Sequence, residues 1–309
     1  MSAPTTHTTS PEEAYLERLL AAQLLLPTDL PGVYARGSAF AHLMEGLEHA
    51  ITRYGRTDET ALLRCPPVLP RSIVEKCGYF QSFPQLLGCM CSFTGGREKH
   101  DALMEAVDAG ENVLAHLELS DVVMAPAACY YVYPYLSGTL PAAGKTTDIE
   151  NWCYRHEPSL NPMRMRSFRM REFVHAGTPE QALGFRDSWI ERAVTFLAQL
   201  GLKATVEPAN DPFFGAGERL MAAQQRAQAL KFELLIPIVS EERPTAVMSS
   251  NYHKEHFGHL FDIHTPDGEM AHTACLAFGM ERIALALLAE HGLQLAHWPT
   301  PLREHLGLR

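Results

Sequence analysis

The sequence predicts an α+β fold in which antiparallel strands pack against helices, and three segments carry that prediction. Residues 39–54 have the spacing of an amphipathic helix. Residues 152–157 and 167–174 alternate like strands, and the Pro, Ser and Asn residues between them are typical of a loop. Residues 273–291 read as a strand, a glycine turn and an apolar helix.

The first of these segments places apolar side chains every three or four residues and ends at Gly55. A short apolar run with two prolines follows at residues 62–67. We expect a helix, then a short strand that the prolines end.

The hairpin brings unlike side chains together. Because side chains alternate along a strand, Arg155 and Glu157 share one face, and Phe168, Met170 and Glu172 share another. A cation for phosphate, a ring for a base and two carboxylates could then converge on a nucleotide. Arg and Glu alternating along a hairpin also suit a solvated face with cross-strand ion pairs, and this segment alone leaves both interpretations open.

Residues 231–239 predict a further buried strand, since apolar side chains occupy alternate positions. Lys231 and Glu233 fall on its other face, so Glu233 is a carboxylate on an otherwise apolar strand. Further along, Gly279 precedes a helix with Arg282 in its first turn. The N–H groups of such a helix end, together with a guanidinium group, favour an anion.

In this order, the segments resemble motifs 1, 2 and 3 of the class II aminoacyl-tRNA synthetases, and the seryl-tRNA synthetase core above all. The resemblance covers about residues 35–295. It implies an antiparallel sheet flanked by helices, and a homodimer formed through the motif 1 segment at residues 39–67.

The resemblance also implies roles in binding ATP. Arg155 would bind the α-phosphate, Glu157 would read the adenine amino group, Phe168 would stack on the adenine, and Arg282 would hold the terminal phosphate. Glu233 would help to hold magnesium with ATP, although Thr245 stands where the seryl enzymes have a second glutamate. Asn251 matches a stretch that lines the substrate pocket.

Two departures from the ordinary seryl enzyme indicate a metal. Cys129 stands where that enzyme has a glutamate that holds the substrate's ammonium group, and Cys275 precedes motif 3. With Glu172 they resemble the zinc site of the atypical archaeal seryl enzymes and of the amino acid:carrier protein ligases. Zinc accepts these ligands and keeps a fourth position for a neutral amine. The alternative is that both cysteines are small buried apolar residues.

Four histidines form a rival candidate for a metal site: His253, His256, His259 and His264. Their polar context and Gly258 predict a loop beside a strand, and a spacing of three residues does not define a tetrahedron. We expect exposed or hydrogen-bonded loop histidines.

The net charge helps to decide between the two kinds of enzyme that the chain resembles, those that act on tRNA and those that act on a carrier protein. The chain has 309 residues and a formal net charge of −10, without a block rich in Lys and Arg, so tRNA is an unlikely partner. The resemblance then implies ATP-dependent activation of glycine or alanine and transfer to a phosphopantetheinylated carrier protein. The alternatives are a zinc-dependent enzyme acting on tRNA, a non-catalytic paralogue that binds an amino acid, and a structural protein.

Residues 1–30 are expected to form a tail, disordered to residue 11, and a short helix, and residues 31–309 the catalytic domain. An insert at about residues 210–230 predicts a helix that either packs on the sheet or docks the carrier protein. The apolar residues 19–26 are too few to span a membrane. Seven irregularly spaced cysteines fit a reducing compartment, so a cytoplasmic enzyme is expected.

Overall fold

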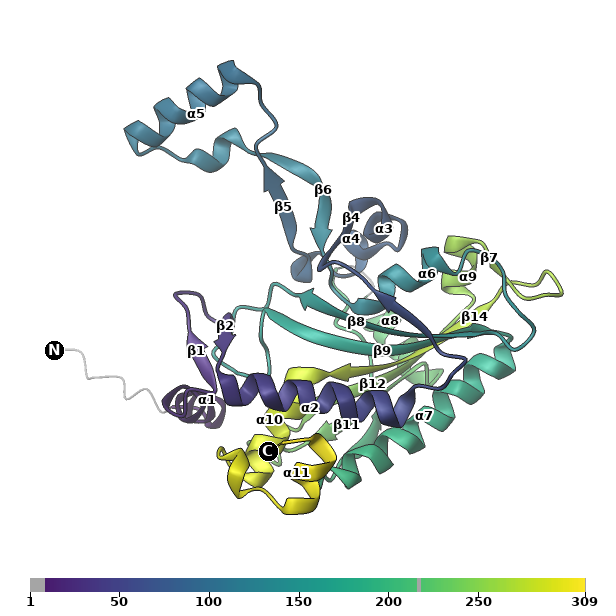
Figure 1. Ribbon diagram of the computed structural model, residues 1–309. Helices are drawn as coiled ribbons and strands as arrows, with labels where there is room; N and C mark the ends of the chain where they lie inside the picture. The colour runs from purple at the N-terminus through teal and green to yellow at the C-terminus, as the bar shows by residue number, and fades with distance from the viewer. Residues whose placement is uncertain (1–8, 216–217, 309) are drawn as a thin grey trace.

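A seven-stranded sheet organises the molecule (Figure 1). The computed structural model describes residues 9–215 and 218–308. Every neighbouring pair in the sheet is antiparallel except β3 and β8, which are parallel. The strands, in spatial order, are β10 (Thr205–Pro208), β11 (Lys231–Ile236), β12 (Thr245–Lys254), β14 (His272–Gly279), β9 (Ser167–Gly177), β8 (Lys145–Tyr154) and β3 (Ala61–Arg64). The predicted α+β fold with an antiparallel sheet is confirmed.

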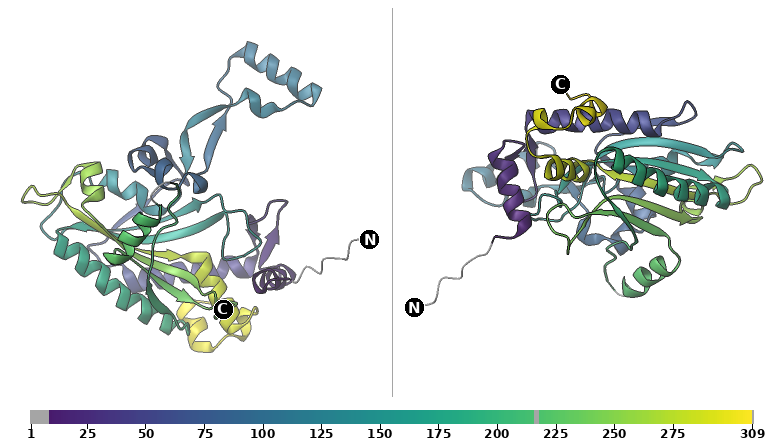
Figure 2. Two further views of the ribbon diagram at one scale, coloured as in Figure 1. Left: turned by 180° about the vertical axis from the view of Figure 1, so that it is seen from behind. Right: turned by 90° about the horizontal axis from the view of Figure 1, so that it is seen from below.

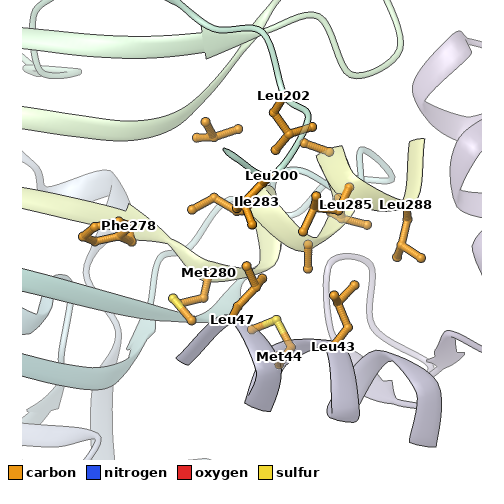
Figure 3. Close-up of a cluster of buried hydrophobic side chains, with 14 of the residues drawn as sticks. Leu43, Met44, Leu47, Leu200, Leu202, Phe278, Met280, Ile283, Leu285 and Leu288 are labelled. Atoms are coloured by element: carbon orange, nitrogen blue, oxygen red, sulfur yellow. The ribbon is translucent and has the colours of Figure 1, made fainter. Parts of the chain in front are cut away.

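Four helices cover one face of this sheet and enclose the main core (Figures 1 and 2). They are α2 (Ser38–Gly55), α7 (Pro179–Gln199), α10 (Met280–His291) and α11 (Thr300–Leu306). Figure 3 shows Leu43, Met44 and Leu47 of α2 facing Met280 and Ile283. The helices α2 and α11 approach closely at Gly46, where a Cβ atom would lie 2.4 Å from the Leu306 carbonyl oxygen. The apolar stripe that predicted α2 therefore builds this core.

The N-terminal segment packs onto the same body. Helix α1 (Pro11–Ala21) begins after Ser10, whose side chain and that of Glu13 form a capping box. The hairpin of β1 (Leu25–Pro27) and β2 (Tyr34–Arg36) follows. The tail was predicted to extend to residue 11, which is too far, because Ser10 caps a helix that begins at Pro11. Residues 1–8 lie outside the described residues. The proposed boundary at residue 30 stays a prediction.

An arm projects from the body beside the sheet (Figure 1). Its base is a three-stranded sheet of β4 (Val68–Pro70), β6 (Glu118–Met124) and β5 (Cys89–Ser92). Its tip holds α5 (Arg97–Ala109) and the 3₁₀ helix η2 (Val113–His116). Short elements complete the chain: α3 (Arg71–Lys76), α4 (Tyr79–Ser82), η1 (Pro84–Leu86), η3 (Ala128–Tyr131), α6 (Val132–Tyr135), β7 (Gly138–Thr139), α9 (His256–Phe261), β13 (Ile263–His264) and η4 (Leu295–His297).

Some predicted boundaries were wrong. Strand β8 begins at Lys145 and ends at Tyr154, so Arg155 and Glu157 lie in the loop that follows it. Strand β11 ends at Ile236, three residues earlier than predicted, next to a bulge in its pairing with β12. The insert does contain a helix, α8 (Glu218–Ala227), but none of its described residues is buried. It lies on the opposite side of the sheet from α2 and α7 (Figure 2), so it does not pack as a core helix.

Candidate active site

The register of the sheet gathers the predicted site residues on the face opposite the four core helices. Residues directly opposite one another on antiparallel strands project to the same side. One row across the sheet runs Lys231, Asn251, Cys275. The next row runs Glu233, Ser249, Ala277, Glu172. Residues from β9, β11, β12 and β14 therefore meet on one surface.

This surface is the floor of a cavity of about 1020 Å³. The volume is in the upper range for small-molecule sites, which suits a nucleotide together with a second substrate. All nine predicted site residues line it: Cys129, Arg155, Glu157, Phe168, Glu172, Glu233, Asn251, Cys275 and Arg282. Segments more than 150 residues apart in the chain thus build a single site, since Cys129 and Arg282 both belong to it.

Arginine side chains dominate one part of the cavity. Arg282 is held by hydrogen bonds from its Nε to the Met163 carbonyl (2.8 Å) and from its Nη1 to the Ala246 carbonyl (2.9 Å). Burial and the charges of Arg155 and Arg164 lower the pKa of Arg282 to about 10. The group stays cationic at neutral pH, and mutual repulsion among these guanidinium groups favours a bound polyanion.

The start of α10 is fixed by its neighbour Glu281, which is only 3% exposed. Its carboxylate accepts hydrogen bonds from the backbone N–H of Arg169 (2.7 Å) and from Arg36 (3.0 Å). The glutamate and the arginine at the start of α10 therefore have distinct roles. Glu281 anchors the helix to β9, and Arg282 reaches the cavity.

Arg155 and Phe168 form a cation–π contact in the cavity. The Arg155 guanidinium carbon lies 5.6 Å from the centre of the Phe168 ring, and its Nε donates to the Pro126 carbonyl (3.1 Å). Glu157 lines the cavity and also forms an ion pair with Arg164 (3.2 Å). The Glu157 side chain thus forms the ion pair that one interpretation of the hairpin expected, and it also lines the cavity, while its role toward a nucleotide stays a prediction.

Two thiols and a carboxyl group meet at another part of the floor. Oε1 of Glu172 accepts a hydrogen bond from the backbone N–H of Cys129 (3.0 Å), and Cys129, Glu172 and Cys275 all line the same cavity. Glu172 and Cys275 are each 2% exposed and Cys129 is 9% exposed. Burial, reinforced by the charge of Glu172, raises the pKa of both thiols well above the ordinary value. Burial also raises the pKa of Glu172.

The chemistry of this donor set suits zinc, which takes thiolate and carboxylate ligands. A divalent cation would offset the charge that the three groups acquire when they lose their protons. Within residues 9–215 and 218–308, no group of three or more His, Cys, Asp or Glu side chains already forms a metal cage. The donor types therefore fit zinc, although the side chains do not already surround a metal position.

The opposite edge of the floor carries a carboxylate that suits magnesium. Mg²⁺ is commonly bound by one or two carboxylates together with substrate phosphates, and Glu233 supplies one carboxylate in the cavity. Its Oε1 lies 3.1 Å from Nζ of Lys231. Thr245, which stands where a second glutamate was looked for, also lines the cavity.

Two residues that line the cavity were missed from sequence. His253 lies two residues after Asn251 on the same strand, β12, and its Nε2 lies 3.8 Å from the Cys275 sulfur. Asp211 binds Lys231 through a 2.7 Å ion pair. Alternation along residues 249–253 could have placed His253 on the same face as Asn251. Asp211 lies in a loop, and no periodic pattern marks it.

The four histidines do not gather. His253 lies on β12, where its Nδ1 hydrogen-bonds Thr273 Oγ1 (3.0 Å), so the predicted loop was wrong there. Burial and the charge of His256 lower the pKa of His253 to about 4, so the ring is neutral at pH 7. His256 and His259 are exposed on α9, and His264 pairs with Asp262 (2.8 Å).

Known proteins resemble this chain in sequence and in fold. Residues 144–291 match the family model of the tRNA synthetase class II core domain (G, H, P, S and T). The crystal structure of Methanopyrus kandleri SerRS in complex with A. aeolicus tRNASec superimposes with a TM-score of 0.80 over 99% of this chain and 62% of that chain. At 22% identity, that match shows a shared fold. The molecule thus has the fold of the class II synthetase core.

Two curated relatives from Bradyrhizobium diazoefficiens are closer in sequence. Amino acid--[acyl-carrier-protein] ligase 1 is 44% identical over 308 residues, covering 99% of this chain and 94% of the relative. Ligase 2 is 45% identical over 291 residues, covering 94% and 87%. This chain belongs to the amino acid--[acyl-carrier-protein] ligase family.

No helix in the described ranges combines the length and the apolar character that a membrane span needs.

Proposed function

We propose that this protein activates glycine or alanine with ATP and transfers the aminoacyl group to the phosphopantetheine thiol of a carrier protein. One observation carries the proposal: a single cavity holds the arginine cluster around Arg155 and Arg282 and the thiol and carboxyl cluster around Glu172. The first suits a polyphosphate, and the second suits an amino group. The names of the two ligase relatives support the carrier protein as acceptor.

In the first step, a carboxylate oxygen of the amino acid attacks the α-phosphorus of ATP. The new P–O bond gives the aminoacyl-adenylate, and the bond to pyrophosphate breaks. Arg155 would bind the α-phosphate and stabilise the charge that builds up there, and Arg282 would hold the terminal phosphate. Phe168 would stack on the adenine and Glu157 would accept from its amino group. Glu233 would contribute to binding the magnesium that accompanies ATP.

Cys129, Glu172 and Cys275 would hold a zinc ion. When bound, zinc would supply a Lewis-acidic position for the neutral amine of the substrate. Asn251 would line the pocket beside it, since its Nδ2 lies 3.5 Å from the Cys275 sulfur. This placement keeps the amine away from ATP and leaves the substrate carboxylate free to react.

In the second step, the phosphopantetheine thiolate attacks the aminoacyl carbonyl, a thioester forms and AMP leaves. A homodimer formed through α2 and β3 is part of the proposal, by the resemblance of these elements to motif 1. All seven cysteines are free, which supports a reducing compartment such as the cytoplasm.

The direct test is ATP–pyrophosphate exchange with each of the twenty amino acids, with and without a zinc chelator. We expect exchange with glycine or alanine, and its loss on chelation. Failure of metal-replete protein to exchange with every amino acid would refute activation.

The acceptor is then tested with holo-carrier protein and with total tRNA. A thioester on the carrier protein supports the proposal, and aminoacylation of tRNA alone would assign the chain to tRNA instead.

A further inference from the structure

The outer wall of the cavity is a roof made of residues 210–214 and 218–228, and polar contacts hold it. The described residues of α8 are all at least partly exposed, and Leu220 and Met221 are 64% and 42% exposed. Met221, Gln224, Gln225 and Gln228 nevertheless line the cavity. Apolar burial therefore does not fix this helix above the site, and its position depends on hydrogen bonds.

One carboxylate lies at the centre of those bonds. Asp211 Oδ2 accepts from Gln225 Nε2 (2.8 Å), and the Asp211 backbone N–H donates to Gln225 Oε1 (2.7 Å). Its other oxygen, Oδ1, accepts from Lys231 Nζ (2.7 Å). Asp211 therefore joins α8 to strand β11 through a single side chain.

Lys231 continues the chain of contacts into the ATP part of the floor. It is 8% exposed, and its ammonium group also lies 3.1 Å from Glu233 Oε1. Burial alone would lower the pKa of Lys231, but the charges of Asp211 and Glu233 outweigh burial and raise it. The ammonium group thus stays charged and is shared between two carboxylates.

The loop that carries Asp211 is held on its other side as well. Phe213 stacks on Phe83 with ring centres 5.3 Å apart, and Gln85 Nε2 donates to the Pro212 carbonyl (2.9 Å). The carboxylate is therefore presented from an anchored loop.

We propose that Asp211 is a positioning residue that holds the roof over the cavity and, through Lys231, sets the Glu233 carboxylate for ATP. This inference rests on the proposed function. With Asp211 present, the Lys231 ammonium group is shared between Asp211 and Glu233, so the Glu233 carboxylate is only partly neutralised and can still act on the ATP complex. Without the charge of Asp211, Lys231 pairs with Glu233 alone and neutralises it. The roof then also loses its link to the sheet.

The test compares Asp211→Asn, Gln225→Ala and Lys254→Met in the full chain. Asn keeps the size of Asp211 but removes its charge. Gln225→Ala removes only the roof contact. Lys254→Met is the matched control, because Lys254 Nζ binds Gln228 Oε1 (2.6 Å) at the end of the roof without touching Asp211.

We expect Asp211→Asn to raise the KM for ATP in glycine-dependent pyrophosphate exchange about tenfold, as loss of a charged hydrogen bond implies. The KM for glycine should change less than about twofold, because Asp211 does not touch the thiol and carboxyl cluster. Asp211→Asn and Gln225→Ala should both speed proteolysis within residues 210–230. Only Asp211→Asn should weaken the binding of ATP. Lys254→Met should leave the KM for ATP unchanged.

An unchanged KM for ATP in Asp211→Asn would overturn the inference, as would an equal rise in Lys254→Met. Calorimetric binding of a non-hydrolysable ATP analogue separates this result from failure of the proposed function. If wild-type protein exchanges with no amino acid, activation is refuted, and the ratio of analogue affinities between wild type and Asp211→Asn still decides the role of Asp211.

Discussion

Arg155 and Arg282 both line the cavity and are partly exposed there, and the charge of Arg155 contributes to the lowered pKa of Arg282. Such an arrangement costs stability in the free protein, because two partly desolvated cations repel each other. A polyphosphate reverses the sign of that interaction. This repulsion, which a bound polyphosphate would relieve, is the physical argument for the proposed binding of ATP by these two side chains.

Replacing Arg155 with Lys keeps the positive charge but removes the planar guanidinium group that lies over Phe168. We expect kcat/KM in pyrophosphate exchange to fall about 10²–10³-fold. The control is Arg192→Lys on α7, where the arginine stacks on Trp189 at 3.9 Å, away from the cavity. Equal losses in both variants would show that the effect comes from folding, which thermal denaturation would register.

The thiol and carboxyl cluster makes a prediction that does not depend on activity. Protein purified without chelators should contain about one zinc ion per chain. Cys275→Ala should lose most of it, because three ligands become two. Cys153→Ala is the matched control, since Cys153 is buried on β8 and does not line the cavity. Elemental analysis by mass spectrometry decides, and zinc-free wild-type protein from zinc-supplemented growth would contradict the assignment.

At the scale of elements, the strands β8 and β9 are joined by a buried ion pair as well as by backbone hydrogen bonds. Asp148 is fully buried and Arg171 is 1% exposed, and they are linked by hydrogen bonds of 2.9 and 2.7 Å. Arg56, just after α2, binds the same carboxylate at 2.7 Å. The pair therefore fixes the hairpin that carries Phe168 and Glu172, and attaches α2 to it.

Asp148→Asn should destabilise the protein by about 3–5 kcal/mol, because it leaves the buried Arg171 without its carboxylate partner. Burial would raise the pKa of Asp148, but hydrogen bonds from Arg171 and Arg56 outweigh it, so the pKa is lowered. The contribution is therefore complete above the unfolded pKa of about 3.9 and is lost as pH falls through the folded value. Urea unfolding across acidic pH should show the difference between wild type and variant shrinking below about pH 4. A constant difference would contradict this pairing.

The elements that sequence predicted well are those whose evidence is local. The apolar stripe of α2, the strand and helix around Gly279, and the strand β9 have their own periodicity. The end of β8 was misplaced because Arg155 continues the alternation after the chain has left the sheet. Helix α8 was expected as a packed or docking helix, since sequence cannot tell whether its apolar residues meet a partner.

The residues of the candidate site likewise fall into those that sequence predicted and those that it did not. The nine residues were predicted because each matches a stretch that resembles a known family, and all nine line one cavity. The link from Asp211 to Lys231 was not found, because it depends on the fold of a loop 20 residues away from its partner. His253 was placed in a loop because Gly258 and nearby polar residues outweighed the alternation that continues from Asn251.

At the scale of the whole molecule, a formal net charge of −10 opposes binding to a polyanion such as tRNA. The cavity concentrates cationic groups in its interior, where they can serve ATP without creating a basic outer surface. The chain also covers 62% of the M. kandleri SerRS chain whose fold it shares. The net charge therefore supports a carrier protein, rather than tRNA, as the acceptor in the proposed reaction.

The proposed homodimer makes the last prediction, and the edge of the main sheet is where it can be tested. Strand β3 lies at one end of the sheet with β8 as its neighbour, and Leu62 on it is 52% exposed. An exposed edge strand offers backbone groups and apolar side chains to a second chain. Light scattering after size exclusion should give about twice 34.4 kDa for wild type. Leu62→Asp should shift it toward monomer at low concentration.

The matched control for this experiment is Leu119→Asp, because Leu119 lies on β6 of the arm and is similarly exposed, at 51%. An added charge at Leu119 should leave the mass unchanged if the interface is formed by α2 and β3. Dissociation by Leu119→Asp but not by Leu62→Asp would move the interface to the arm. A wild-type monomer at every concentration would remove the dimer from the proposal while leaving the active site, which one chain builds by itself, intact.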